Sequence, residues 1–284
     1  MSLGLAQICR FRASGMRAGT QGEFNVGLLS ESGTKVKHLN VNGLNTLLQS
    51  PNPLDYINDL ASRPMGEFNS SEVKFLPPIE APSSVWGVYA IPKEQRLNGN
   101  VGLFPKGEAS MIKGPGENLT IKRDSNLTVP EVELVLITTG GEGGKVVALT
   151  MGNDMSAKDI IKGHPSYLSR GKLWNGSCAL GPSILVGAIE DIAREFKASL
   201  AITRGGTNLF PVEAKAIADR IDGFEQLRRQ LHDEVDFPGL TYLMTGSLAP
   251  VPADFRLQHG DIVDMEIVGV PGIGRLTNPV IKLS

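Results

Sequence analysis

Hydrophobic residues in most of this chain alternate with polar ones or form short runs between glycines and prolines. That pattern is typical of strands joined by tight turns. From about residue 82 most segments predict strands, beginning with SVWGVYAI (84–91). SLAITRGGTNLFP (199–211) predicts a hairpin that turns at Gly205-Gly206. The last stretch, GDIVDMEIVGVPGIGRLTNPVIKL (260–283), predicts two antiparallel strands.

Helical periodicity is rare in the same region. Apolar residues at i, i+3, i+7 and i+11 predict an amphipathic helix in FEQLRRQLHDEV, at Phe224, Leu227, Leu231 and Val235. MSAKDIIKG (155–163) predicts a short helix, and HPSYLSRGKLWNGSCALGPSI (164–184) reads mostly as loop. ASMIKGPGENLTIKRD (109–124) predicts two short strands around its Gly-Pro-Gly. We therefore expect a β-rich α+β protein.

The first part of the chain predicts a small unit of its own. QICRFRA, NVGLLSE and VKHLNV read as strands, and GLNTLLQ and PLDYINDLAS read as short helices. The polar, proline-containing stretch EFNSSEVKFLPPIEAPSS (67–84) reads as a linker. We expect a small N-terminal α+β domain over residues 1–78 and a second domain over residues 79–284.

Two glutamates stand at the head of a strand that is otherwise apolar. In VPEVELVLIT, Glu131 and Glu133 are two residues apart, so their side chains point to the same face of the strand. Two neighbouring carboxylates repel each other, and burial adds a desolvation cost. A bound cation would resolve both problems, and so would ion pairs with lysine or arginine.

The segment that follows brings a third acid to the pair. After GGEGG comes a second apolar run, KVVALTMGND, which ends at Asp154. A hairpin that turns near Glu142 places Asp154 almost opposite Glu131. Three carboxylates then form an oxygen-ligand site for a hard divalent cation, Mg²⁺ first, with Mn²⁺ or Ca²⁺ possible. Zinc is not expected, because the cluster contains no histidine or cysteine.

The composition limits which partners and which cellular compartment the sequence predicts. The hydrophobic share of 41% and charged share of 20% are ordinary for a globular protein. The net charge of −2, with no basic cluster interleaved with aromatics, argues against nucleic acid. No apolar run reaches membrane-spanning length, so no membrane partner is expected. Cys9 and Cys178 belong to no motif, and the N-terminus lacks the order of a secretory signal, so we expect a cytoplasmic protein.

Other polar residues allow two readings each. Lys172 lies close to Trp174 and Asn175 in a predicted loop, where a lysine is usually a solvated surface charge. His164 could be an acid/base group or a surface histidine. The Thr245-Gly246 pair could present a hydroxyl and N–H groups to an anionic substrate, or could simply form a turn.

Five stretches taken in order resemble the fumarylacetoacetate hydrolase superfamily over about residues 82–284. They are PEVELVLI, MGNDMSAKDI, GKLWNGSCALGPSI, LMTGS and GDIVDMEIVGVPGIGRLTNPV. The resemblance implies a mixed β-sandwich roll with a metal site in a central cleft, and a homodimer. It implies metal ligands at Glu131, Glu133 and Asp154, a catalytic lysine at Lys172, and substrate-binding positions at Lys106, Thr245 and Gly246.

One stretch departs from the hydrolases of that superfamily. They usually carry a histidine followed by a glutamate that activate water, whereas VWGVYAIPKEQRLNGN (85–100) contains no histidine. This stretch is more similar to the branch that dehydrates 2-keto-3-deoxy sugar acids. In that branch an acid and an arginine align with Glu94 and Arg96.

The resemblance therefore predicts Mg²⁺-dependent dehydration of a 2-keto-3-deoxy pentonate through a metal-stabilised enolate. Lys172 would be the base at C3, and Glu94 or an ordered water the acid for the departing hydroxide. Cleavage of a C–C bond in an acylpyruvate-type 2,4-diketo acid stays open, with His164 or a residue of the N-terminal unit as a substitute base. Decarboxylation of oxaloacetate and a sugar-acid-binding protein without turnover are further alternatives.

Overall fold

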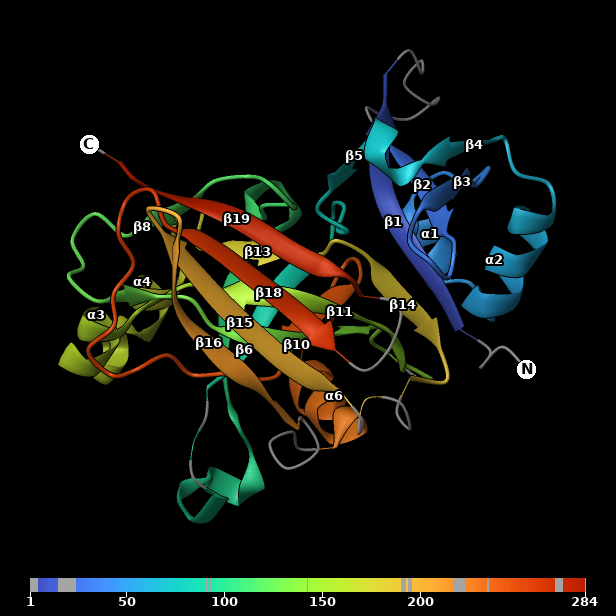
Figure 1. Ribbon diagram of the computed structural model, residues 1–284. Coiled ribbons are helices and arrows are strands. Elements are labelled where there is room, and N and C mark those ends of the chain that lie inside the picture. The colour runs from blue at the N-terminus through green and yellow to red at the C-terminus, as the bar shows by residue number, and fades with distance from the viewer. Residues whose placement is uncertain are drawn as a thin grey trace.

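The structure is a computed structural model in which two β-sheets pack face to face (Figure 1). It describes residues 5–14, 24–89, 91, 93–141, 143–189, 193, 196–216, 223–233, 235–268 and 273–283. Strands dominate and helices are short, so the predicted β-rich α+β class and mixed β-sandwich are confirmed.

The larger sheet has twelve strands, of which ten lie in the order β4-β3-β2-β1-β14-β11-β10-β17-β6-β7. β13 joins it by pairing with β11, and β5 joins it by pairing with β1. Its strands are β1 (Leu5–Ala13), β2 (Asn25–Leu29), β3 (Lys35–His38), β4 (Gly66–Asn69), β5 (Val73–Leu76), β6 (Ser84–Tyr89), β7 (Gly102–Glu108), β10 (Val132–Thr138), β11 (Val146–Asp154), β13 (Cys178–Leu180), β14 (Ile184–Gly187) and β17 (Thr241–Met244).

The smaller sheet has five strands in the order β16-β15-β18-β19-β8. They are β8 (Leu119–Ile121), β15 (Lys197–Arg204), β16 (Thr207–Ala216), β18 (Ile262–Val268) and β19 (Arg275–Lys282). The predicted hairpin at Gly205-Gly206 is confirmed, because Arg204 lies opposite Thr207 in the β15–β16 pair. The last two strands are antiparallel, as predicted. A separate pair joins β9 (Thr128–Val129) to β12 (Ser156–Ala157).

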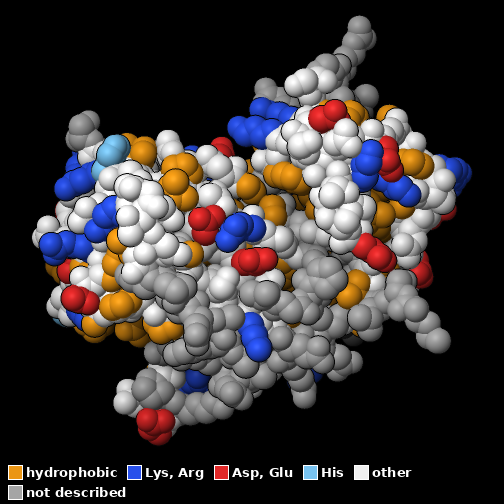
Figure 2. Space-filling model, in the orientation of Figure 1, with side chains coloured by type: hydrophobic (Ala, Val, Ile, Leu, Met, Phe, Trp, Pro, Cys, Tyr) orange, Lys and Arg blue, Asp and Glu red, His pale blue; other side chains and the backbone are white. Residues whose placement is uncertain are grey.

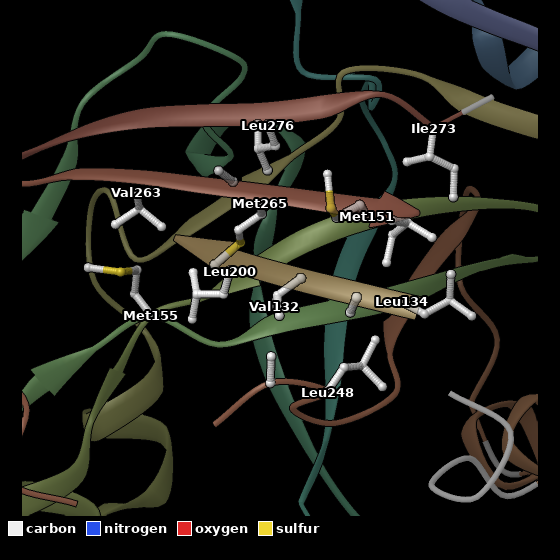
Figure 3. Packing of buried hydrophobic residues seen from close by; sticks show 14 of the residues in the cluster. Val132, Leu134, Met151, Met155, Leu200, Leu248, Val263, Met265, Ile273 and Leu276 are labelled. Atoms are coloured by element: carbon white, nitrogen blue, oxygen red, sulfur yellow. The ribbon is translucent and has the colours of Figure 1, made fainter. Parts of the chain in front are cut away.

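The core between the sheets explains the apolar run at the centre of the chain. Val132 and Leu134 of β10 pack in one cluster with Leu200 of β15 and Met265 of β18 (Figure 3). Val135, on the opposite face of β10, belongs to a second cluster that includes residues of the N-terminal helices. Since both faces of β10 are covered, every residue of this strand is buried, and the alternation expected of a half-exposed strand is lost.

The N-terminal strands continue the larger sheet. β1 pairs antiparallel with β14, with Ile8 opposite Ile184. Helices α1 (Leu44–Leu48) and α2 (Pro53–Ser62) lie where the sequence predicts them, and Asn52 caps α2 through the Asp55 amide. The division into domains at residues 1–78 and 79–284 stays a prediction.

Two segments predicted to be irregular contain regular structure. The expected linker at 67–84 includes most of β4 and all of β5, which pair with β3 and β1. Both strands are only partly buried, so they carry polar residues and lack a strong apolar pattern. The expected loop at 164–184 contains the 3₁₀ turn η5 (Pro165–Tyr167), helix α4 (Leu168–Lys172) and β13.

Two boundaries also differ from the prediction. Helix α6 (Phe224–His232) ends before Val235, whose side chain is exposed. Of the two strands expected around Gly114–Gly116, only β8 forms, and residues Ala109–Met111 form a 3₁₀ turn, η4. The predicted short helix is confirmed as α3 (Lys158–Gly163).

The surface shows no single-sign field on the face drawn in Figure 2. Acidic and basic side chains are interspersed there among the described residues. In the part of the chain that the structure describes, no helix combines the length and the apolar character needed to cross a membrane.

Candidate metal centre

The β10–β11 hairpin has the register that the sequence predicts. Val132 lies opposite Asn153, and Glu133 lies opposite Gly152. Just beyond the last pair, the Asp154 amide donates to the Glu131 carbonyl at 2.9 Å. Asp154 is therefore placed across the hairpin from Glu131, as predicted.

The three acids form one buried cluster. Glu131, Glu133 and Asp154 each offer a carboxylate oxygen, and these oxygens lie within 4.8 Å of one another. The residues are 8%, 2% and 1% exposed. Carboxylates that are this close and this deeply buried repel one another strongly unless positive charge lies between them.

One oxygen of each carboxylate is bound by a donor of the protein. The Gly246 amide donates to Glu133 Oε2 at 2.8 Å. Lys106 Nζ lies 2.6 Å from Asp154 Oδ1, and Lys158 Nζ pairs with Glu131 Oε1. These contacts fix the orientation of each acid and leave its second oxygen for other partners.

Lys172 occupies the space between two of these acids. Its ammonium donates to Glu131 Oε2 at 2.7 Å, to Asp154 Oδ2, and to Ser156 Oγ at 2.6 Å. The side chain is buried at the end of α4 and is not solvated. Of the two readings that the sequence allows for Lys172, the solvated surface charge is wrong.

The acids of the cluster differ in how far their negative charge is compensated. Burial alone would raise the pKa of Glu131, but Lys172 and Lys158 hold it at about 2. Burial raises the pKa of Glu133 well above its usual value, and the neighbouring Asp154 and Glu131 carboxylates raise it further. Among the described residues, no lysine or arginine forms an ion pair with Glu133. Glu133 is thus the acid whose charge the protein leaves least compensated.

The donor set fits a hard divalent cation. The grouped ligands are all carboxylate oxygens, and their mutual repulsion at Glu133 is the cost that a bound cation would remove. The sequence leaves two ways to compensate these acids, an ion pair or a bound cation, and the structure has the residues for both in one place. Lys172 supplies an ion pair, and the three acids supply a ligand set.

The Thr245-Gly246 pair follows β17, which pairs with β10. Gly246 has a φ of 104°, which favours glycine, and its N–H donates to Glu133. A Cβ at Gly246 would meet no atom within 4 Å. Thr245 Oγ1 donates to the Leu134 carbonyl at 3.0 Å. The pair therefore borders the acids, with open space beside Gly246.

Glu94 and Arg96 are not brought to the cluster. They lie between β6 and β7 in a segment (93–101) that projects from the two sheets (Figure 1). Glu94 is exposed, and Arg96 Nε donates to the Ile91 carbonyl at 2.9 Å. His164 is exposed as well, and its ring accepts from the Ser166 amide.

Two residues that contact the cluster were not identified from the sequence. Ser156 Oγ donates to Glu131 Oε2, and Lys158 Nζ pairs with the other oxygen of the same carboxylate. Both belong to the segment MSAK (155–158), from which the sequence predicts only the start of a helix. The signal available was the proximity of a hydroxyl and a cation to Asp154 at the end of β11.

The sequence of this chain is similar to those of known proteins. Residues 90–281 match the model of the fumarylacetoacetate (FAA) hydrolase C-terminal family. The chain is 30% identical over 178 residues to the probable 2-keto-3-deoxyxylonate dehydratase of Haloferax volcanii. That match covers 63% of this chain and 59% of the relative, less than two thirds of its length. The chain is also 28% identical over 236 residues to the 2-dehydro-3-deoxy-D-arabinonate dehydratase of Saccharolobus solfataricus. This second match covers 76% of this chain and 77% of the relative.

The fold has close counterparts among solved structures. A 2-keto-3-deoxy-D-arabinonate dehydratase complexed with magnesium and 2,5-dioxopentanoate superposes with a TM-score of 0.76 at 24% identity. The superposition covers 98% of this chain and 99% of that one. Since the family model covers most of residues 79–284, the chain belongs to the fumarylacetoacetate hydrolase family.

Proposed function

We propose that this chain dehydrates a 2-keto-3-deoxy pentonate in a reaction that depends on a divalent cation, Mg²⁺ first. The observation that carries the proposal is the buried cluster of three carboxylates with Lys172 among them. Relatives named as 2-keto-3-deoxyxylonate and 2-dehydro-3-deoxy-D-arabinonate dehydratases support the choice of substrate class.

Glu131, Glu133 and Asp154 would hold the cation. Bound there, it would supply Lewis-acid polarisation of the carboxylate and keto oxygens of a 2-oxo acid, which acidifies the C3 protons. Loss of a C3 proton and of the C4 hydroxyl releases one water. Moving a proton from C5 to C3 then gives a 4,5-enol, and transfer of the enol hydroxyl proton to C4 gives the 2,5-dioxo acid.

Lys172 is the proposed base for the C3 proton. Although burial disfavours its charge, the Asp154, Glu131 and Glu133 carboxylates raise the pKa of Lys172 above its usual value. With those carboxylates engaged by a cation, the attraction that keeps the ammonium protonated is reduced. Ser156 Oγ, at 2.6 Å, would then keep the amine in place.

Gly246 and Thr245 are the proposed contacts for the anionic end of the substrate. They border Glu133, and a Cβ at Gly246 would meet open space. Glu94 and Arg96 stay predictions. Their exposed segment between β6 and β7 would have to approach the acids before Glu94 could protonate the departing hydroxide.

The test is incubation of the protein with Mg²⁺ and 2-keto-3-deoxy-arabinonate or 2-keto-3-deoxy-xylonate, followed by detection of 2,5-dioxopentanoate. Glu131→Gln serves as the matched control, because it removes one proposed ligand without changing side-chain size. Absence of product from both substrates would overturn the assignment.

The same preparation separates the alternatives. Release of a carboxylic acid from an acylpyruvate would indicate a hydrolase, and CO₂ from oxaloacetate a decarboxylase. Binding of a sugar acid without turnover would indicate a non-catalytic relative. A homodimer and a cytoplasmic location stay predictions, and the mass of the protein in solution tests the first.

A further inference from the structure

Lys106 is buried, and its ammonium faces Asp154 and two backbone carbonyls. It lies in β7, and its side chain is 0% exposed. Its ammonium lies 2.6 Å from Asp154 Oδ1 and donates to the Met155 carbonyl at 2.8 Å and to the Lys172 carbonyl. Two of the three N–H donors of the ammonium are used by these carbonyls, and its contact with Asp154 Oδ1 is an ion pair that lacks hydrogen-bond geometry.

These contacts determine which oxygen of Asp154 can bind a cation. With Oδ1 on Lys106, only Oδ2 remains, and Oδ2 is the oxygen that pairs with Lys172. A carboxylate held in this way binds a metal through one oxygen. Mg²⁺ demands near-octahedral geometry with short bonds, whereas Ca²⁺ accepts bidentate carboxylates and six to eight ligands.

The same ammonium also fixes Lys172. It binds the backbone carbonyl of Lys172 at the end of α4, while the Lys172 side chain reaches the acids. Lys106 therefore joins β7, the end of β11 and α4 at one point. The Trp174 ring, whose centroid lies 5.2 Å from Lys106 Nζ, stabilises this charge by a cation–π contact.

We propose that Lys106 is a positioning residue that keeps Asp154 monodentate and thereby sets a preference for Mg²⁺ over Ca²⁺. The proposal rests on the metal site of the proposed function. It does not depend on which 2-oxo acid is the substrate. The substrate contact that family resemblance suggests for Lys106 stays a prediction.

The experiment measures Mg²⁺ and Ca²⁺ dissociation constants by calorimetry without substrate. Lys106→Met and Lys106→Gln are compared with Lys122→Met as the matched control. Lys122 lies 5.9 Å from the same Trp174 ring but pairs with Asp124, outside the cluster. Loss of a nearby positive charge shifts both affinities together, so the ratio of the two constants isolates the coordination effect.

We expect the Lys106 variants to lower the preference for Mg²⁺ over Ca²⁺ by about tenfold, equivalent to ~1.4 kcal/mol. Lys122→Met should leave the ratio unchanged. An unchanged ratio in folded Lys106 variants overturns the proposal, and melting curves establish that they are folded. Should both variants fail to fold, a crystal structure of the wild-type protein with Mn²⁺ decides. Asp154 bound through both oxygens overturns the proposal, and Asp154 bound through Oδ2 with Oδ1 on Lys106 supports it.

The two proposals fail in different ways. A wild-type protein that binds neither ion overturns the metal site and the proposed function with it. A wild-type protein that binds Mg²⁺ but does not dehydrate either pentonate overturns the substrate assignment alone. An altered ratio in the Lys106 variants would stand in that second case.

Discussion

Lys172 Nζ lies 2.7 Å from Glu131 Oε2, on the side of the carboxylate that Lys158 does not occupy. The same ammonium pairs with Asp154 Oδ2. Lys172 therefore takes the two carboxylate oxygens that the proposed cation would use. The proposed base and the proposed cation would therefore compete for the same negative charge.

This competition predicts opposite effects of Lys172→Met on binding and on turnover. Removing the ammonium leaves only Lys158 and Lys106, among the described residues, to compensate Glu131 and Asp154, so Mn²⁺ or Mg²⁺ should bind more tightly. Dehydration should fall by roughly 10²–10⁴-fold, the usual contribution of a general base. Calorimetry and a product assay on one preparation check both. Weaker metal binding in the variant would contradict the competition.

Glu131, just before β10, and Glu133, within β10, should respond oppositely to the same substitution in the metal-free protein. Glu133→Gln removes the like-charge repulsion and keeps an acceptor for the Gly246 N–H, so it should stabilise the fold by about 1 kcal/mol. Glu131→Gln leaves the buried Lys172 without one of its carboxylate partners and should destabilise by about 3 kcal/mol. Both should lose metal binding.

Thermal melting without metal checks this prediction. At this chain length, each kcal/mol shifts Tm by roughly 2–4 °C. A fall in Tm for Glu133→Gln would contradict the repulsion at Glu133, and equal shifts for the two variants would show that the acids are compensated equally.

The part of the site that lies within one hairpin could be predicted from the sequence. Glu131, Glu133 and Asp154 follow from strand periodicity and the glycine-rich turn, because both are local properties. The strands of the smaller sheet and the helices α1 and α2 follow from similar local patterns.

The contacts between distant segments could not be predicted in this way. Lys106 and Asp154 are brought together only when β7 and the end of β11 are joined across α4. The burial of Lys172 depends on the same packing, and an isolated lysine in a polar stretch gives no sign of it. The edge strands β4 and β5 were missed because a half-exposed edge requires no strong apolar pattern.

Both cysteines should be inert in the folded protein. Burial raises the pKa of Cys9 and of Cys178 to about 12, so their thiolate fraction at pH 8 is on the order of 10⁻⁴. Ellman's reagent at pH 8 should therefore modify neither thiol, and should modify both after unfolding in guanidinium. Rapid modification of either one in the native protein would show that its surroundings open.

The raised pKa of Glu133 makes both stability and metal binding depend on pH. A carboxyl whose pKa is higher in the folded state binds its proton more tightly there than in the unfolded chain. The metal-free protein should therefore lose stability as pH rises from the usual value of 4.5 through the raised value. Metal binding requires the carboxylate, so it releases this proton, and the affinity should rise over the same pH window.

Melting curves between about pH 5 and pH 8, with and without Mg²⁺, check this dependence. The stabilisation by Mg²⁺ should grow with pH in the wild-type protein. Without metal, Glu133→Gln should show a flatter dependence of Tm on pH than the wild type, because a glutamine carries no titrating proton. Parallel curves for the two proteins would mean that Glu133 does not titrate in this range, and that the acids of the hairpin share their charge more evenly than the fold indicates.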